Sequence, residues 1–184
     1  MTKTNTQTTA LLLIDLLNDC QFQHGETLAS KAKALVPNIL ACKQYFYQHN
    51  WPVVYINDHY ELWQADYDKI LAHCQNELTK DWISQYRPTE KDEFLIKPRH
   101  SAFFGTALHT FLHERGVNTV WLAGLAGNIC VLFTANDAYM RDFSLVVPQD
   151  ASASVSENDQ AYALTMMQNV LKARVAPTVE LTQS

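Results

Sequence analysis

Three residues of the chain, Asp15, Lys97 and Cys130, are of the types that nucleophilic acyl chemistry uses, and each follows an apolar segment. A thiolate is a strong nucleophile, a nearby ammonium group favours the thiolate, and a carboxylate can accept the thiol proton. Cys130 also stands where a helix is expected to begin, and the positive end of a helix dipole favours a thiolate. Each residue alone has an ordinary explanation, because a free cysteine is commonly buried and a lone lysine is commonly a solvated charge. The three predict a catalytic site only if the fold brings them to one place.

The apolar segments that precede these residues indicate buried strands. They are continuous rather than alternating, which is typical of parallel strands covered on both faces. Helical periodicity lies between them, and Ser156 with Asp159 forms a possible capping box before the last helix. This alternation predicts an α/β fold with right-handed crossovers. The expected strands are residues 10–15, 53–57, 94–96, 119–123, 144–147 and 173–176, and the expected helices are residues 28–46, 108–115, 130–141 and 161–171.

Length and composition indicate one globular domain. The chain has 184 residues, 47% of them hydrophobic and 18% charged, where roughly 150 residues per domain is usual. We expect a disordered N-terminal tail over residues 1–9 and a single domain over residues 10–184. The net charge of −5 argues against nucleic acid as a partner, since phosphate binding needs a basic surface.

Other compartments and partners are disfavoured by what the sequence lacks. No apolar run approaches the roughly 18 residues of a membrane span, and residues 1–9 have no apolar core typical of a signal peptide. The four cysteines, Cys20, Cys42, Cys74 and Cys130, show no paired spacing of a zinc site. We therefore expect a cytoplasmic protein with reduced thiols and a small-molecule substrate.

The ends of the expected strands are where a ligand should bind, because open parallel sheets bind ligands beyond the carboxyl ends of their strands. No GxGxxG motif and no Walker motif occurs, and the carboxylate of Asp19 after the first strand would repel a phosphate. We expect no cofactor. Gly124 and Gly127 suit a tight turn whose amides point outward, towards an anion or an oxyanion.

Three segments in the same order resemble the isochorismatase-like cysteine hydrolases, a family that includes nicotinamidases, carbamoylsarcosine amidohydrolases and isochorismatases. The most specific is GLAGNICVLFTANDA at residues 124–138; the others are LLLIDLLND at 11–19 and KPRHSAF at 97–103. The resemblance extends roughly over residues 8–176. It implies a three-layer sandwich with a six-stranded, mostly parallel sheet flanked by helices in a Rossmann-like topology, and a homo-oligomer, either a dimer or a tetramer.

The resemblance also implies roles for individual residues. Asp15, Lys97 and Cys130 match the catalytic triad of the family. A cis peptide bond is implied between Leu125 and Ala126, and the backbone amides of Ala126 and Cys130 are implied to form the oxyanion hole. The metal site of nicotinamidases is not expected, because Tyr60 stands where a histidine ligand would be, although Asp58 matches the acidic ligand and His59 and His73 lie near.

The pocket is less defined by the sequence than the triad. Phe22, Trp63 and Phe103 are candidates for its walls, since substrate sites are mostly apolar. Arg99 is a candidate partner for a substrate carboxylate. Of the histidines outside the 58–93 segment, His100 is expected nearest the site. The irregular segment over residues 58–93 is expected to cover one end of the sheet.

Three functions stay open at this point. The first is a cysteine amidohydrolase that cleaves a small amide, carbamoyl or imide compound through an acyl-cysteine thioester. The second is a vinyl-ether hydrolase of the isochorismatase type, which releases pyruvate and does not need an acyl-cysteine. The third is a non-catalytic thiol switch, because an activated Cys130 is also open to oxidation.

Overall fold

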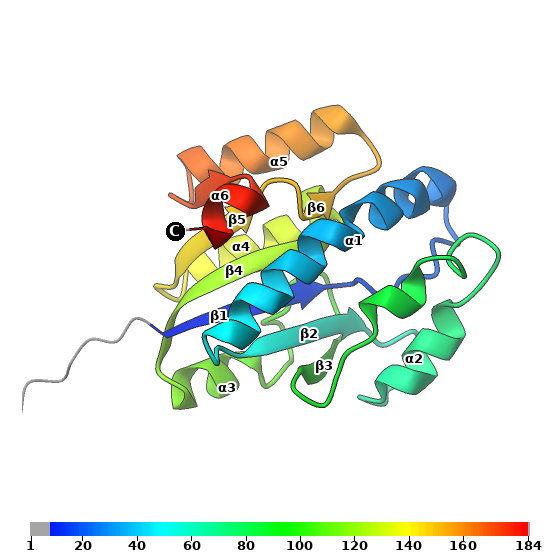
Figure 1. The fold of residues 1–184 in the computed structure, drawn as a ribbon, viewed down its shortest axis with the longest axis horizontal. Helices are drawn as coiled ribbons and strands as arrows, with labels where there is room; N and C mark the ends of the chain where they lie inside the picture. The colour runs from blue at the N-terminus through cyan, green and yellow to red at the C-terminus, as the bar shows by residue number, and fades with distance from the viewer. Residues whose placement is uncertain (1–7, 184) are drawn as a thin grey trace, which may run out of the picture.

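The continuous apolar segments form one parallel sheet. The computed structural model describes residues 8–183, and the strands run through the middle of the molecule between layers of helices (Figure 1). The sheet has seven strands in the order β3-β2-β1-β4-β5-β7, with β6 paired to β4. The strands are β1 (Thr8–Ile14), β2 (Val53–Asp58), β3 (Glu93–Lys97), β4 (Val117–Leu125), β5 (Ser144–Pro148), β6 (Ser152–Ala153) and β7 (Arg174–Ala176).

Two differences from the expected strands stand out. β1 begins at Thr8 and Thr9 is buried, so these two residues belong to the sheet rather than to the expected tail; residues 1–7 of that tail lie outside the described residues. β6 is a short strand that apolar patterning does not reveal, because it has only two residues.

The helices cover the two faces of the sheet. They are α1 (Gly25–Gln48), α2 (Tyr67–Cys74), α3 (Leu108–Glu114), α4 (Leu132–Tyr139), α5 (Glu157–Asn169) and α6 (Thr178–Thr182). The capping box expected before α5 is present in part: the side chain of Ser156 accepts a hydrogen bond from the backbone N–H of Asp159. No helix within residues 8–183 has the length and apolar character that would let it cross a membrane.

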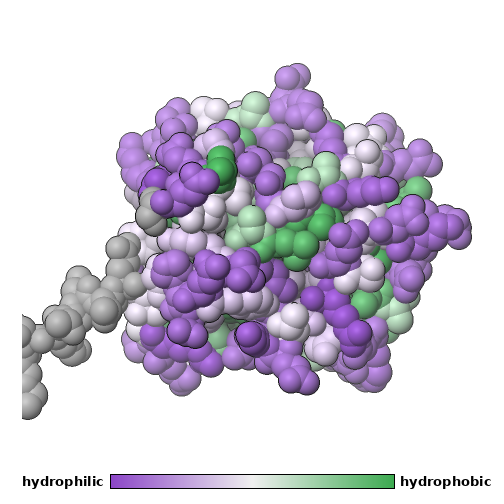
Figure 2. All heavy atoms as spheres, in the orientation of Figure 1, coloured by the Kyte–Doolittle hydropathy of each residue, from purple (hydrophilic) through white to green (hydrophobic). Residues whose placement is uncertain are grey.

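Alternate residues of β1 divide the core into two layers. Leu11 and Leu13 pack with α1 on one face, whereas Ala10, Leu12 and Ile14 pack with the residues of α3, α4 and α5 on the other. Both faces of the strand are thus buried, which explains its unbroken hydrophobicity. Figure 2 shows that polar side chains cover most of the face seen in Figure 1, with hydrophobic atoms confined to smaller areas between them.

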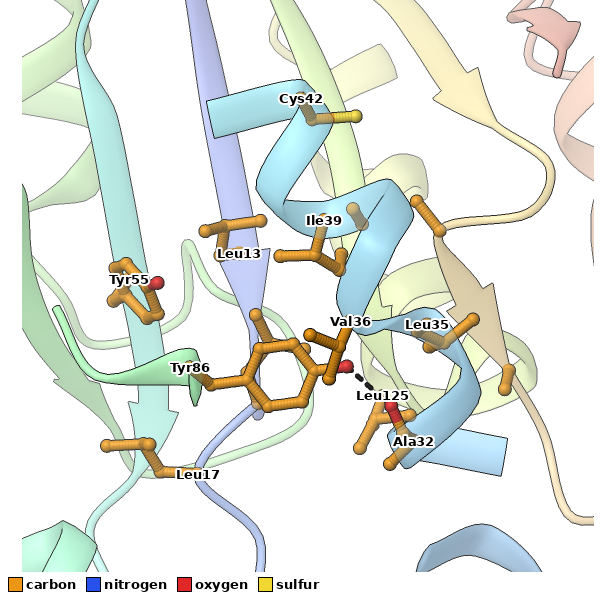
Figure 3. Packing of buried hydrophobic residues seen from close by; sticks show 14 of the residues in the cluster. Leu13, Leu17, Ala32, Leu35, Val36, Ile39, Cys42, Tyr55, Tyr86 and Leu125 are labelled. Atoms are coloured by element: carbon orange, nitrogen blue, oxygen red, sulfur yellow. Dashed lines mark hydrogen bonds between the residues drawn. The ribbon is translucent and has the colours of Figure 1, made fainter. Parts of the chain in front are cut away.

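The irregular 58–93 segment contributes to the core rather than only covering one end of the sheet. Beyond α2 it forms a 3₁₀ turn, Ile83–Tyr86, whose residues pack under α1 (Figure 3). The hydroxyl of Tyr86 donates a hydrogen bond of 2.5 Å to the carbonyl oxygen of Ala32 in α1. This segment therefore fixes α1 against the sheet.

The register of β1 with its neighbours determines what meets at the carboxyl edge. Ile14 pairs with Ile56 of β2 on one side and with Gly124 of β4 on the other. Asp58 of β2 pairs with Lys97 at the end of β3. The order of strands reverses between β1 and β4, so the residues that follow these two strands flank the switch point where ligands bind in such sheets.

The close approach of β4 to β1 requires a glycine at position 124. Gly124 has φ +124°, and a Cβ there would lie 2.0 Å from the carbonyl oxygen of Ile14. Gly116 also has a positive φ, +63°, but a Cβ there would meet nothing within 4 Å. A substitution at Gly116 would therefore show the cost of the backbone conformation alone, whereas one at Gly124 would add the cost of a steric clash.

We predict that Gly124→Ala lowers the free energy of unfolding by more than about 3 kcal/mol, because the clash with Ile14 adds to the strain of a positive φ. Gly116→Ala, the matched control, should cost about 1–2 kcal/mol from the backbone conformation alone. Urea denaturation followed by circular dichroism measures both. Equal losses in the two variants would contradict the close approach.

Candidate active site

The structure brings Asp15, Lys97 and Cys130 together at the carboxyl edge of the sheet. Asp15 directly follows β1, Lys97 ends β3, and Cys130 lies in the turn after β4. Lys97 Nζ is 2.9 Å from Asp15 Oδ2 and 3.6 Å from Cys130 Sγ. Asp15 and Lys97 are buried, with 5% and 1% of their surfaces exposed, whereas Cys130 is half-buried. A buried ion pair therefore lies in contact with a thiol that solvent can reach.

Backbone groups fix the carboxylate of Asp15. The residue has φ +49°, a left-handed conformation that is uncommon outside glycine and in which Asp and Asn are enriched. Its Oδ1 accepts a hydrogen bond of 2.8 Å from the N–H of Asp58. Oδ2 is left to face Lys97 and the thiol.

A neighbouring asparagine ties the loops after β1 and β2 together. The buried side chain of Asn57 accepts a hydrogen bond from the N–H of Leu17 at 3.0 Å and donates one to the carbonyl oxygen of the same residue at 2.8 Å. The hydroxyl of Tyr60 donates to that carbonyl at 3.2 Å. These contacts hold Asp15 between two anchored loops.

Cys130 lies in a π-helical turn, Gly127–Val131, rather than at the first turn of an α-helix as expected from the sequence. The carbonyl oxygen of Ala126 accepts hydrogen bonds from the N–H groups of Ile129 and Val131, at 3.0 and 3.2 Å. The peptide bond between Leu125 and Ala126 is cis. The turn therefore begins directly beyond β4 and leads into α4.

Side chains of β6, of the loop that follows it and of α5 hold this turn in place. The N–H of Asn128 donates to Ser154 Oγ at 3.0 Å, and Ser154 Oγ donates to Gln160 Oε1 at 2.6 Å. Gln160 Nε2 donates in turn to the backbone and side chain of Ser152. A Cβ at position 127 would lie 2.1 Å from Gln160 Oε1, so Gly127 lets this support come close.

The turn is also tied to the loop after β3. Thr134 Oγ1 donates to the carbonyl oxygen of Cys130 at 2.7 Å and accepts from the N–H of Ala102 at 3.0 Å. Ser101 donates a short hydrogen bond to Asp137 of α4. Hydrogen bonds thus connect the loop after β3, which follows Lys97, to the turn that carries Cys130.

Burial dominates the protonation of the three groups. It raises the pKa of the Asp15 carboxyl above its ordinary value, and the charge of Lys97 offsets only part of this. Burial also raises the pKa of the Cys130 thiol; the Asp15 carboxylate adds to the increase and Lys97 opposes it. Burial acts to lower the pKa of Lys97, but the charges of Asp15, Cys130 and Asp58 outweigh it and the pKa is raised. These shifts favour a thiol at Cys130, whereas its position alone favours a thiolate.

A cavity of about 500 Å³ opens beside the thiol. The triad and Ala126 line this cavity, and the remaining lining residues form an apolar wall and a polar wall. The apolar wall consists of Phe22, Leu28, Ile129 and Val155. The polar wall consists of Asn18, Asp19, Asp58, Tyr60, His100 and Asn128. A cavity of this size admits a small organic molecule.

Only one of the four candidate pocket residues, Phe22, lines this cavity. Phe103 is instead a core residue, 5% exposed and packed against Phe143 at 5.8 Å between ring centroids. Trp63 is 65% exposed and stacks on His59. Arg99 is exposed, and its guanidinium donates to the carbonyl oxygen of Pro98. The expected pocket roles of Trp63, Arg99 and Phe103 are therefore not supported.

The histidines divide in a similar way. Nδ1 of His100 lies 3.8 Å from Cys130 Sγ, and the His100 ring meets Phe133 edge to face. His73 contacts the ring of Tyr60 and lies 4.0 Å from Asp19. Over residues 8–183 no three His, Cys, Asp or Glu side chains form a group that could hold a metal ion, so the donor set does not fit the metal site of nicotinamidases.

Sequence reasoning missed most of the apolar wall. Leu28 belongs to an apolar helix face whose spacing does not distinguish a pocket residue from a core residue. Val155 lies in a loop, where the sequence shows no hydrophobic periodicity. Ile129 belongs to the cysteine motif and could have been found as the residue before the nucleophile. Tyr60 was singled out only as the replacement of a histidine, although its position after β2 places it at the same edge as Asp15.

Comparisons with known proteins agree on one family. The isochorismatase domain matches residues 9–182. The uncharacterized isochorismatase family protein YaaI of Bacillus subtilis (strain 168) is 52% identical over 174 residues, which is 95% of this chain and 96% of that protein.

Solved structures give the same answer. Nicotinamidase PncA from Bacillus subtilis is 30% identical with a TM-score of 0.73, over 92% of this chain and 100% of that one. N-carbamoylsarcosine amidase from Thermoplasma acidophilum is 28% identical with a TM-score of 0.69, over 94% of this chain and 97% of that one. The chain belongs to the isochorismatase family of hydrolases.

Proposed function

We propose that the protein is a cysteine-dependent amidohydrolase that cleaves a small amide, carbamoyl or imide compound through an acyl-cysteine intermediate. The observation that carries the proposal is the contact of Lys97 Nζ with both Asp15 Oδ2, at 2.9 Å, and Cys130 Sγ, at 3.6 Å, at the wall of a cavity. A nucleophile, a base and a cation within reach of one another are the groups that acyl transfer needs.

The first step joins proton transfer to attack. Because the resting group is a thiol, Asp15 accepts its proton as Cys130 Sγ bonds to the carbonyl carbon of the substrate. Lys97 stabilises the negative charge that develops on sulfur. The carbonyl oxygen becomes an oxyanion, which the N–H groups of Ala126 and Cys130 hold; losing one such donor typically costs about 10²–10³ in rate.

The second half of the reaction uses the same carboxyl group. Asp15, now protonated, gives its proton to the leaving nitrogen as the carbon–nitrogen bond breaks, which leaves a thioester on Cys130. Asp15 then takes a proton from water, whose oxygen attacks the thioester and releases the acid. The thiol regains its proton and the cycle closes without a cofactor.

Amide chemistry is favoured over the cleavage of a vinyl ether for two reasons. Two of the similar solved structures are amidases by name, a nicotinamidase and an N-carbamoylsarcosine amidase. A nucleophilic thiol set between a carboxylate and an ammonium group also has a purpose in acyl transfer, whereas a vinyl ether needs only a proton donor and water.

Replacement of the nucleophile tests the proposal directly. With a panel of small amides, carbamoyl compounds and imides, Cys130→Ala should lose turnover by at least about 10³-fold, because no thioester can form. Mass spectrometry of the wild type quenched during turnover should show an acyl adduct on Cys130. A panel without any turnover, or equal rates in the two proteins, would contradict the proposal, and pyruvate release that survives in Cys130→Ala would favour the vinyl-ether reaction.

Replacement of the base should separate hydrolysis from thiol reactivity. We expect Asp15→Asn to lower turnover by at least about 10²-fold, because the proton acceptor is lost. The same change removes a charge that raises the pKa of the Cys130 thiol, so iodoacetamide should alkylate Cys130 faster at pH 8 than in the wild type. Slower alkylation in this variant would argue against the assigned contact.

The pH dependence of kcat/KM follows from the same shifts. The active form has Asp15 ionised and Cys130 protonated, and the pKa of each is raised, from ordinary values of 3.8 and 9.0 respectively. Activity should fall as pH decreases through the Asp15 pKa, with the acidic limb above 3.8, and the alkaline limb should lie above 9.0. A profile whose acidic limb lies below pH 3.8 would exclude Asp15 as the base.

A further inference from the structure

Apart from the triad, the charged side chains that line the cavity are negative. Lys97 and Asp15 form an ion pair at 2.9 Å and neutralise each other. Two further carboxylates, Asp19 and Asp58, line the cavity, and no lysine or arginine other than Lys97 is among its lining residues. The remaining titratable groups there are Tyr60 and His100 and, behind Asp19, His73 at 4.0 Å.

The arginine nearest to Lys97 in the sequence does not compensate these negative charges. Arg99 stands two residues after Lys97, but its side chain is directed to the carbonyl oxygen of Pro98 and does not line the cavity. A substrate carboxylate would therefore find no guanidinium to bind it. Recognition of a carboxylate in proteins relies mostly on such a group or on an unpaired lysine.

Neither of the two extra carboxylates forms an ion pair with a lysine or an arginine among residues 8–183; the basic side chain beside Asp19 is His73, with Nε2 at 4.0 Å. Oδ1 of Asp19 accepts the N–H of Gln21 at 3.0 Å, and Oδ1 of Asp58 accepts the N–H of Tyr60 at 2.9 Å. Backbone amides orient these groups but leave their negative charge in place. The protein as a whole carries a net charge of −5, which repels anions in the same sense.

The rest of the wall is apolar. Phe22, Leu28, Ile129 and Val155 form one side of the cavity. The cavity of about 500 Å³ thus offers hydrophobic contact for a short carbon chain or ring, and a negative potential around its polar side. Low-dielectric walls of this kind focus the field of the charges that they hold.

We propose that the cavity excludes anionic substrates, and that the compound hydrolysed is a small uncharged or cationic amide with an apolar substituent and no carboxylate. This inference rests on the proposed function for the identity of the bond, but the charge selection belongs to the cavity itself. Asp19 and Asp58 are the specificity-determining residues.

Reagents that differ in charge measure the selection at Cys130 without any hydrolysis. The probes are 2-(trimethylammonium)ethyl and 2-sulfonatoethyl methanethiosulfonate, with methyl methanethiosulfonate as the neutral reference. In each case sulfur bonds to sulfur, methanesulfinate leaves, and the thiol proton is released. Cys130→Ala gives the background from the buried cysteines, and 2-mercaptoethanol gives the intrinsic ratio of the reagents.

At low ionic strength the cation-to-anion rate ratio at Cys130 should exceed that of 2-mercaptoethanol at least tenfold. It should decline as salt is added, because exposed charges are screened. Asp19→Asn, which keeps the acceptor for Gln21, should lower the ratio severalfold. Glu90→Gln, an equal change of charge on an exposed residue near the opposite end of β3, should leave it unchanged. A ratio equal to that of the free thiol would overturn the inference.

Three amides of matched length then test the substrate class. Pentanamide, 4-aminobutanamide and glutaramate end in a methyl, an ammonium and a carboxylate group respectively. We expect kcat/KM for glutaramate to be at least tenfold below both others, and the glutaramate-to-pentanamide ratio to rise in Asp19→Asn. Equal rates on the three would overturn the charge selection. A selective thiol with no amide turned over would instead count against the amidohydrolase proposal and leave the selection standing.

Discussion

The ion pair between Asp15 and Lys97 is the constraint on which the site depends. Removing two charges from water costs several kcal/mol per ion, and their attraction repays this only when their other hydrogen-bonding positions are also satisfied. Here the N–H of Asp58 binds one oxygen of Asp15, and Lys97 Nζ donates to the carbonyl oxygen of Arg99 at 3.1 Å. Apolar residues could fill the same volume without that cost. The pair is therefore best explained by what it does to the adjacent thiol.

The sheet order makes this contact possible. β1 lies between β2 and β4, which are far from each other in sequence, and β3 lies beyond β2. Parallel strands end at the same edge, so the residue after β1, the last residue of β3 and the turn after β4 converge without any of them being neighbours in the chain. The close approach at Gly124 brings the end of β4 against Ile14, directly before the carboxylate.

The sequence predicted the parts of this protein that local patterns encode. Continuous apolar segments located six of the strands, and residue type with position located three side chains that meet at the carboxyl edge of the sheet. The pocket walls were harder, because a phenylalanine in a motif says nothing of its orientation: Phe103 turns into the core against Phe143. Trp63, with φ +51°, turns outward onto His59. The turn that holds Cys130 was also not predictable, since Ser154 and Gln160 support it from a distant segment.

The raised pKa of the Cys130 thiol agrees with the proposed mechanism, in which the thiol loses its proton only as it attacks the substrate. An ionised Asp15, a protonated Lys97 and a thiol at Cys130 together carry no net charge, and a buried site favours an arrangement without net charge. In the proposed reaction, transfer of the proton from sulfur to Asp15 keeps that sum at zero, so no uncompensated charge forms before the carbon–sulfur bond does. The negative charge then passes to the substrate oxygen, which lies outside the ion pair. It is at that atom that backbone N–H groups are needed, and the turn after β4 is the element that can supply them.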